Sequence, residues 1–133
     1  MKNSLKYLSI FVLIALTVTA CLSDDGNDSD SYENEVQTLQ TLKADIEALV
    51  ATSVCNESTE CKSIAFGSKP CGGPWSYLIY STSIDTQELE TKVGQYNQLE
   101  AIFNAKWGVL SDCAVANPPV DIICENNECV AVY

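Results

Sequence analysis

The sequence predicts a small α+β domain whose six elements follow in the order α-β-β-α-β-β. Two stretches carry apolar residues at intervals of three and four, the spacing of one buried helix face. Four shorter stretches are rich in β-branched and aromatic residues and are bounded by turn-forming residues, as strands are. Six cysteines follow the first helical stretch. We therefore expect two layers, with both helices on one face of a small antiparallel sheet and with disulfides cross-linking the domain.

The first helix is expected at about residues 35–52. Its apolar positions recur at helical spacing and leave charged residues on the other face; they are Val36, Leu39, Leu42, Ile46, Leu49 and Val50. Asn34, with Gln37 three residues later, resembles a capping box, in which side chains satisfy free amides at a helix start. Strands at residues 62–66 and 75–81 should follow and flank a loop rich in glycine and proline.

The second helix has a stronger start signal. Asp85 can cap it, and Glu88 follows three residues later. Gly108 supplies a left-handed stop. The buried stripe is expected to comprise Leu89, Val93, Tyr96 and Phe103, widened by Leu99 and Ile102. Strands at residues 120–124 and 128–132 then form a terminal hairpin around Asn126-Asn127, because asparagine tolerates positive φ.

The beginning of the chain has the pattern of a secretory signal. Lys2 and Lys6 precede an apolar run, Leu8–Ala20, which ends on small residues just before Cys21. That run is shorter than the ~20 residues that a membrane-spanning helix needs. We expect residues 1–20 to be a signal peptide and residues 21–35, with their many acids and no base, to be a disordered tether. Residues 36–133 are left as the folded domain.

The residues around Cys21 also match a known class. Val18-Thr19-Ala20-Cys21 resembles the lipobox of bacterial lipoproteins. The resemblance implies that Cys21 becomes the first residue of the mature chain and carries acyl chains such as palmitate. It also implies attachment to the bacterial outer membrane. The acidic segment Leu22–Gly26 resembles the export signal of surface lipoproteins of Bacteroidota, which implies the cell surface, with the periplasmic face as the alternative.

The mature part is similar to small Cys-rich bacterial lipoproteins of undefined role. The similarity rests on the pair Cys55…Cys61, on Cys71-Gly72-Gly73, and on the terminal pair Cys124…Cys129. It implies a disulfide-rich domain and no particular activity.

Charge and missing residue types exclude several functions. The chain has 18 acidic residues, seven lysines, no histidine and no arginine, for a net charge of −11. We expect no nucleic-acid partner, because phosphate binding needs a basic surface, and membrane attachment only through Cys21. Without histidine there is no catalytic triad and no imidazole metal site. Acidic pairs such as Glu88/Glu90 could hydrolyse glycosides only within a cleft, so we expect no enzyme and no cofactor.

Six cysteines remain once Cys21 is assigned to lipid. An even set in an exported chain favours three disulfides among Cys55, Cys61, Cys71, Cys113, Cys124 and Cys129. The spacings lack the two-residue interval of a zinc knuckle, so we expect no metal. Cys124 and Cys129 face each other in the predicted hairpin and could bridge across it. Each could instead reach back to Cys55, Cys61 or Cys113, and the sequence leaves both pairings open.

The segment Gly67–Trp75 is the main candidate for a binding site. Its glycines, prolines and central Cys71 make it stiff and shaped. It could be a structural turn. It could act as a protease-inhibitor loop, with Lys69 as specificity residue and Pro70 resisting cleavage. It could also bind a glycan or peptide through Trp75 and Tyr77, expected on one strand face. The sequence thus predicts a lipid-anchored domain with a binding or structural role, its target unnamed.

Overall fold

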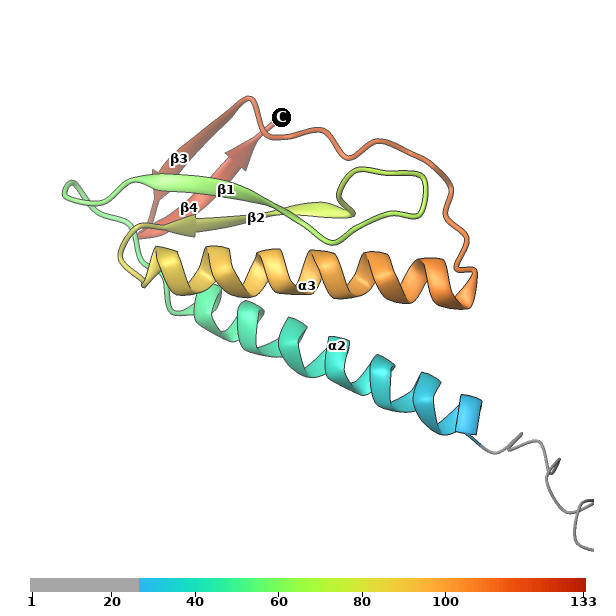
Figure 1. Ribbon diagram of the computed structural model, residues 1–133. Helices are drawn as coiled ribbons and strands as arrows, with labels where there is room; N and C mark the ends of the chain where they lie inside the picture. The colour runs from blue at the N-terminus through green and yellow to red at the C-terminus, as the bar shows by residue number, and fades with distance from the viewer. Residues whose placement is uncertain (1–26) are drawn as a thin grey trace, which may run out of the picture. The chain divides into compact units, whose positions relative to one another are not determined.

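The computed structural model describes residues 27–133, which contain two helices and four strands in the predicted order (Figure 1). The elements are α2 (Asn27–Ala51), β1 (Cys61–Phe66), β2 (Ser76–Ser81), α3 (Thr86–Trp107), β3 (Asp121–Glu125) and β4 (Glu128–Val132). The predicted α+β class is confirmed. The chain divides into two units, residues 1–32 and 33–133, and the packing below is that of the second. The expected signal peptide and Cys21 lie outside the described residues.

Helix α2 begins at Asn27, well before the expected start near residue 35. The acidic segment expected to be a disordered tether up to residue 35 is therefore helical from residue 27 onward. Carboxylates near a helix N-terminus interact favourably with the helix dipole, so Asp30 favours this earlier start. Asn34 lies inside the helix, where its carbonyl accepts a hydrogen bond from the Thr38 hydroxyl (2.8 Å). The expected capping box at Asn34 is not formed.

Helix α3 starts and stops where the sequence predicts. The Asp85 side chain accepts a hydrogen bond from the Glu88 amide (2.9 Å), and Gly108 ends the helix in the left-handed conformation. The expected positions Leu89, Val93 and Tyr96 are buried, and Asn104 is buried with them. Ile102, expected to widen the apolar stripe, is instead 55% exposed.

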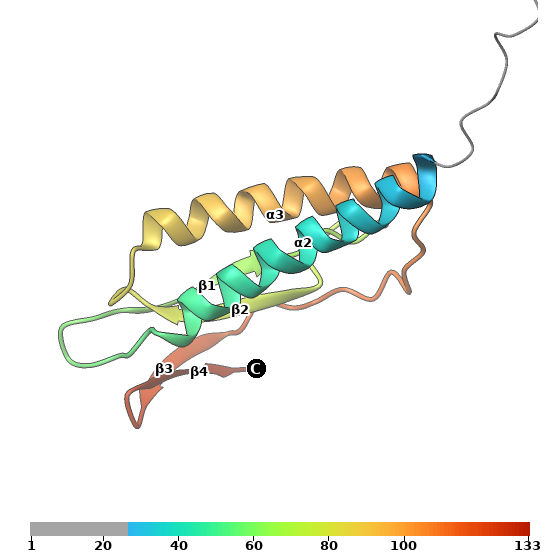
Figure 2. The ribbon, with the colours of Figure 1, turned by 90° about the horizontal axis from the view of Figure 1, so that it is seen from below.

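The strands pair as two antiparallel hairpins rather than as one continuous sheet. The first runs from Cys61 opposite Ser81 to Phe66 opposite Ser76. The second turns at Asn126-Asn127, both with positive φ as predicted. In Figures 1 and 2 the two helices lie on one side of the first hairpin and the second hairpin lies on the other, so a third layer is present.

The core lies between the helices and the first hairpin. Successive strand residues point to opposite faces, and the helix-facing set of β1 and β2 is Ile64, Phe66, Leu78 and Tyr80. These side chains meet Ile46 of α2 and the buried residues of α3. The rings of Phe66 and Tyr96 stack with centroids 4.7 Å apart. The opposite face of β1 carries Cys61, which reaches the second hairpin.

Three disulfides join the six cysteines, which confirms the predicted framework. The pairs are Cys55–Cys124, Cys61–Cys129 and Cys71–Cys113, with Cα–Cα distances of 5.9, 5.6 and 5.4 Å. Cys124 and Cys129 stand opposite each other in the hairpin register, yet each bonds to a cysteine at or near β1. The second hairpin is therefore covalently attached to the first, and the bridge across the hairpin is not formed.

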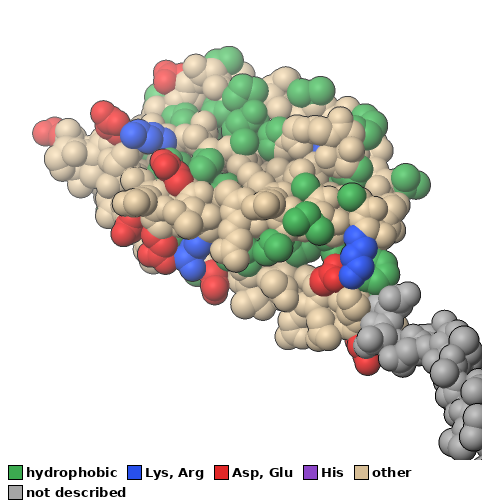
Figure 3. Space-filling view, in the orientation of Figure 1, with side chains coloured by type: hydrophobic (Ala, Val, Ile, Leu, Met, Phe, Trp, Pro, Cys, Tyr) green, Lys and Arg blue, Asp and Glu red, His purple; other side chains and the backbone are tan. Residues whose placement is uncertain are grey.

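Acidic side chains outnumber basic ones among the described residues. Each of the five lysines in residues 27–133 has a carboxylate oxygen 2.5–3.9 Å from its nitrogen. On the face drawn in Figure 3, blue groups lie next to red ones, and green hydrophobic groups lie along the upper part, the side on which Figure 1 has β3 and β4. Ile123, Val130 and Val132 are each between 37% and 39% exposed on that hairpin. Within residues 27–133, no helix is long and apolar enough to cross a membrane.

Candidate functional site

The loop between β1 and β2 is folded into a tight, internally hydrogen-bonded turn. The Lys69 amide donates to the Gly73 carbonyl, and the Gly72 amide donates to the Lys69 carbonyl, both at 2.8 Å. Gly67, Gly72 and Gly73 all have positive φ, which glycine adopts without steric cost. The Trp75 amide then returns to the Phe66 carbonyl at 3.0 Å, at the end of β1. The stiff, shaped loop that the composition predicts is present.

Lys69 points into the protein. Only 8% of its side chain is exposed, and its ammonium donates to Asp112 Oδ1 (3.2 Å) and to the Ala114 carbonyl. The same ammonium lies 5.0 Å from the centroid of the Trp75 ring, a cation–π contact. The Ala114 amide, followed by Lys69, lowers the pKa of the Asp112 carboxyl below its usual 3.8. Lys69 therefore anchors the loop, while Pro70 beside it is exposed.

A second attachment lies next to this ion pair. Cys71 in the loop bonds Cys113 in the segment that leads from α3 to β3. Both cysteines are exposed, and Cys113 has a positive φ of 53°. The loop is thus tied to the 111–114 segment by one covalent bond and one buried ammonium. Such a double attachment restricts the conformational freedom of the loop.

Helix α3 holds the loop from the other side through three polar residues that the sequence analysis did not single out. Asn97 Oδ1 accepts from the Gly67 amide (2.7 Å), and Asn104 Nδ2 donates to the Ser68 carbonyl (2.7 Å). Glu100 accepts from the Ser68 amide and from the Tyr96 hydroxyl (3.1 Å). A signal was available, since these residues recur at spacings of three and four beside the apolar stripe. In the structure Asn104 is buried, and buried polar groups are usually hydrogen-bonded, as it is to the loop.

Trp75 is the exposed aromatic of this region. Its side chain lies against Gly67, where a Cβ atom would come within 3.0 Å of Trp75 Cδ1. Although the residue is 40% exposed, its ring is held by Gly67 on one side and by the Lys69 ammonium. The structure therefore presents a large, fixed, partly exposed aromatic surface. Fixed aromatic rings lose little conformational freedom when a ligand covers them.

One wall of an open cleft is formed by this ring. The cleft has a volume of about 300 Å³ and is lined by Lys43, Glu47, Phe66, Gly67, Trp75, Ser76, Leu78, Tyr96 and Glu100. These residues come from α2, α3 and the end of the first hairpin where the loop joins β1 to β2. The lining combines aromatic rings with two carboxylates, one ammonium and two hydroxyls, those of Ser76 and Tyr96. Burial and the adjacent Glu100 raise the pKa of the Tyr96 hydroxyl, which therefore stays protonated and donates to Glu100.

Tyr77 does not belong to this cleft. Its neighbours Leu78 and Tyr80 face the helices, so alternation along β2 turns Tyr77 toward the second hairpin. It is half-buried there. Of the four residues expected to bind a ligand, the structure brings only Trp75 into the cleft lining. Lys69 supports the Trp75 ring from within, and Pro70 lies in the exposed turn.

Among residues 27–133, one group of potential metal-binding side chains comes together, namely Cys55, Cys61 and Cys129. Their sulfur atoms are engaged in disulfides. The acidic pair Glu88/Glu90 is exposed on α3, where Glu88 lies 3.6 Å from Lys92. Glu125 and Glu128 stand opposite each other beside the Asn126-Asn127 turn and are exposed. Neither pair lines the open cleft beside Trp75, which we call the Trp75 cleft.

No protein-family model, no curated protein and no solved structure matches this chain.

Proposed function

We propose that this chain is a lipid-anchored protein of the bacterial cell envelope whose disulfide-stapled domain binds a neutral glycan in the Trp75 cleft. The observation that carries the binding proposal is the exposed Trp75 ring, fixed by Gly67 and Lys69 at the mouth of a cleft with carboxylates. The proposal is for a binding domain and not an enzyme, since the chain has neither histidine nor arginine.

The chemistry of the lining favours a sugar. A pyranose ring has an apolar face of C–H groups and a rim of hydroxyls. Trp75 offers a flat surface to the apolar face, and the carboxylates of Glu47 and Glu100 can accept hydrogen bonds from the hydroxyls. Glu100 already has two donors, and each carboxylate oxygen has a further lone pair. The cleft volume of about 300 Å³ is at the lower end of the usual range for small-ligand sites.

The charge of the cleft and of the whole chain favours an uncharged glycan over an anionic one. Lys43 faces the cleft but is paired with Glu47 at 3.9 Å, and the chain as a whole carries a charge of −11. An anionic sugar such as a uronate would meet like charge in the cleft and across the surface. A neutral sugar avoids this repulsion. We therefore propose neutral glycans as the ligand class.

The inhibitor alternative has no structural support in this conformation. A specificity residue must project into the cleft of a protease, but the Lys69 ammonium is buried against Asp112, Ala114 and the Trp75 ring. Presenting Lys69 would break all three contacts. We therefore do not carry this function forward.

A single-tryptophan protein provides a direct test of glycan binding. The chain has two tryptophans, so Trp107→Phe leaves Trp75 as the only indole reporter. Titration with neutral hexasaccharides of glucose and mannose should shift its emission, and polygalacturonate should not. In the unmodified protein, Trp75→Ala should weaken binding by about tenfold or more, whereas Tyr77→Phe should leave it unchanged. Circular dichroism confirms that each variant is folded.

Two results would reject the glycan. One is the absence of any emission shift with neutral oligosaccharides at millimolar concentration. The other is a shift produced by a short oligolysine peptide alone, which would identify the acidic, aromatic cleft as a site for cationic peptides.

The anchor is tested separately in a bacterial host. The intact chain should be found in the membrane fraction and should incorporate labelled palmitate, and Cys21→Ser should abolish both. Membrane retention of Cys21→Ser without label would mean that something other than lipid holds the protein.

A further inference from the structure

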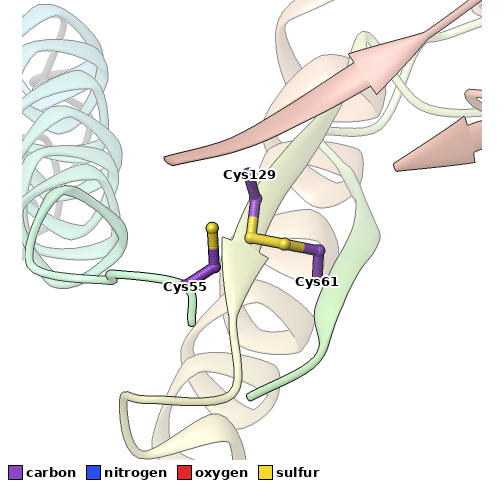
Figure 4. Close-up of side chains that lie close together, drawn as sticks. All are labelled: Cys55, Cys61 and Cys129. Atoms are coloured by element: carbon purple, nitrogen blue, oxygen red, sulfur yellow. A yellow bond between two sulfur atoms is a disulfide. The ribbon is translucent and has the colours of Figure 1, made fainter. Parts of the chain in front are cut away.

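Two of the three disulfides lie side by side. Cys55–Cys124 and Cys61–Cys129 meet where the second hairpin crosses the end of β1. The sulfur atoms of Cys55, Cys61 and Cys129 are all within 4.8 Å of one another. Figure 4 shows the Cys55 sulfur beside the Cys61–Cys129 bridge. Cys124 is the fourth cysteine of this region, because it is bonded to Cys55 and stands opposite Cys129 in the hairpin, although its sulfur lies outside the group of three.

The backbone around these cysteines is held by interactions that do not involve sulfur. The Cys55 amide donates to the Asn127 carbonyl of the hairpin turn (3.0 Å). The Val54 amide, one residue earlier, donates to the Ser83 hydroxyl (2.9 Å). Beside Cys61, Glu60 and Thr82 exchange two hydrogen bonds of 2.8 and 2.9 Å. Because these hydrogen bonds do not involve sulfur, reduction of the disulfides does not remove them directly, and we expect them to hold the four cysteine positions near one another.

The spacing of the sulfurs is close to that of a tetrahedral metal site. With Zn–S bonds of about 2.3 Å, the sulfurs of a tetrathiolate zinc site are about 3.8 Å apart. The Cys55 sulfur lies within 4.8 Å of the sulfurs of Cys61 and Cys129, so it needs to approach them by at most about 1 Å. Within each disulfide the sulfurs must separate, which rotation about the Cα–Cβ bonds allows.

The four cysteines differ in burial, which would allow a metal ion both to reach the site from solvent and to be shielded once bound. Cys55 is 1% exposed, and Cys61 and Cys129 are half-buried. Cys124 is exposed on the hairpin. A metal ion can therefore enter on the Cys124 side and be shielded by the other three ligands. Zinc in structural sites is usually enclosed in this way by four protein ligands.

We propose that the reduced protein binds one Zn²⁺ through the thiolates of Cys55, Cys61, Cys124 and Cys129. A phosphine reductant converts each disulfide and one water molecule into two thiols and one phosphine oxide. A dithiol reductant instead converts each disulfide into two thiols by exchange, and its own two thiols become a disulfide. Zn²⁺ then displaces the protons of the coordinating thiols. The disulfides and the metal are mutually exclusive, so the redox conditions select between two cross-links at one place. The proposal is independent of glycan binding.

Cobalt provides the optical test, because Co²⁺ occupies tetrathiolate sites with the same geometry and absorbs visible light. The full mature domain is reduced with a phosphine under nitrogen and titrated with Co²⁺, followed by competition with Zn²⁺. We expect one metal per chain, a thiolate-to-cobalt charge-transfer band, and its loss when zinc is added. The oxidised protein should bind no cobalt. If reduction unfolds the domain, zinc should restore its circular dichroism spectrum.

Cysteine variants distinguish metal binding at this site from nonspecific binding of the metal to free thiols. Loss of a second-shell partner typically weakens a metal site by about 10–100-fold, so loss of a ligand in Cys124→Ser or Cys129→Ser should weaken binding by about tenfold or more. The double variant Cys71→Ser/Cys113→Ser removes the distant disulfide and should bind as tightly as the unmodified chain. Equal weakening in both sets, no weakening in either, or no metal bound by the reduced protein would each overturn the proposal.

Discussion

Replacement of Gly67 by alanine tests whether the Trp75 ring is fixed as the cleft requires. Gly67 has a φ of 82°, and a Cβ there would lie within 3.0 Å of Trp75 Cδ1 and 3.0 Å from Glu100 Oε2. Two penalties therefore combine. An L-residue at positive φ costs about 1–2 kcal/mol, and overpacking against a held side chain costs about 1–3 kcal/mol. Gly67→Ala should thus lower the free energy of unfolding by about 2–5 kcal/mol.

Two other glycines separate these penalties. Gly72 has a similar φ of 92°, but nothing lies within 4 Å of a Cβ built there. Gly72→Ala should therefore show only the backbone strain, about 1–2 kcal/mol. Gly94 lies inside α3 with ordinary φ and open space around it. Gly94→Ala should stabilise the protein by about 0.5–1 kcal/mol, because alanine is the better helix former.

Urea unfolding of the disulfide-intact proteins, followed by tryptophan fluorescence, measures all three differences. The gap between Gly67→Ala and Gly72→Ala reports the contact with Trp75. Gly67→Ala should also shift the emission of Trp75 in the Trp107→Phe background. Equal stability of the Gly67 and Gly72 variants, with unchanged emission, would show that the ring moves aside freely and that the cleft has no fixed wall.

Three more predictions address the attachments of the loop. Asp112→Asn should lower stability at neutral pH. The difference should begin to shrink as pH falls toward 3.8 and should be lost as pH falls through the lower folded-state pKa of Asp112, because the contribution is present only while the carboxylate is ionised. Urea unfolding at a series of pH values measures this, and a pH-independent difference would contradict it. Asn104→Ala should cost about 1–3 kcal/mol because it leaves a loop carbonyl unpaired, whereas exposed Asn117→Ala should change stability by less than about 0.5 kcal/mol; equal effects in urea would refute the role of Asn104. The double variant Cys71→Ser/Cys113→Ser opens a long loop and should lower stability by about 2–4 kcal/mol, and an unchanged thermal midpoint would show that Lys69 and α3 alone hold the loop.

Local signals explain which parts of the fold the sequence could predict. The start of α3 depends on Asp85 and Glu88, which are three residues apart, and the terminal turn depends on Asn126 and Asn127. Each of these features depends on a few residues that are close together in the sequence. The start of α2 was missed because residues 27–35 are polar and lack an apolar stripe. A helix there shows no periodicity, and its N-terminal acids signal a helix start only weakly.

Long-range contacts explain the rest. The sequence identified Lys69 but not its environment, since Asp112 and Ala114 lie more than 40 residues away along the chain. The disulfide pairing was undetermined for the same reason, because it depends on where the second hairpin crosses β1. The polar residues Asn97 and Glu100 were visible at helical spacing. Their role depends on a loop some 30 residues earlier, which the helical pattern alone cannot indicate.

The disulfide pattern has a consequence for the order in which the protein can mature. Cys55 and Cys61 are synthesised 69 and 68 residues before their partners, Cys124 and Cys129. Throughout that interval each has the other as its nearest thiol in the chain, and a bond between them would close a short non-native ring. Correct oxidation must therefore wait for the last hairpin or repair an early mistake by thiol–disulfide exchange. Native oxidation of Cys55 and Cys61 therefore depends on formation of the last hairpin, which brings Cys124 and Cys129 to them.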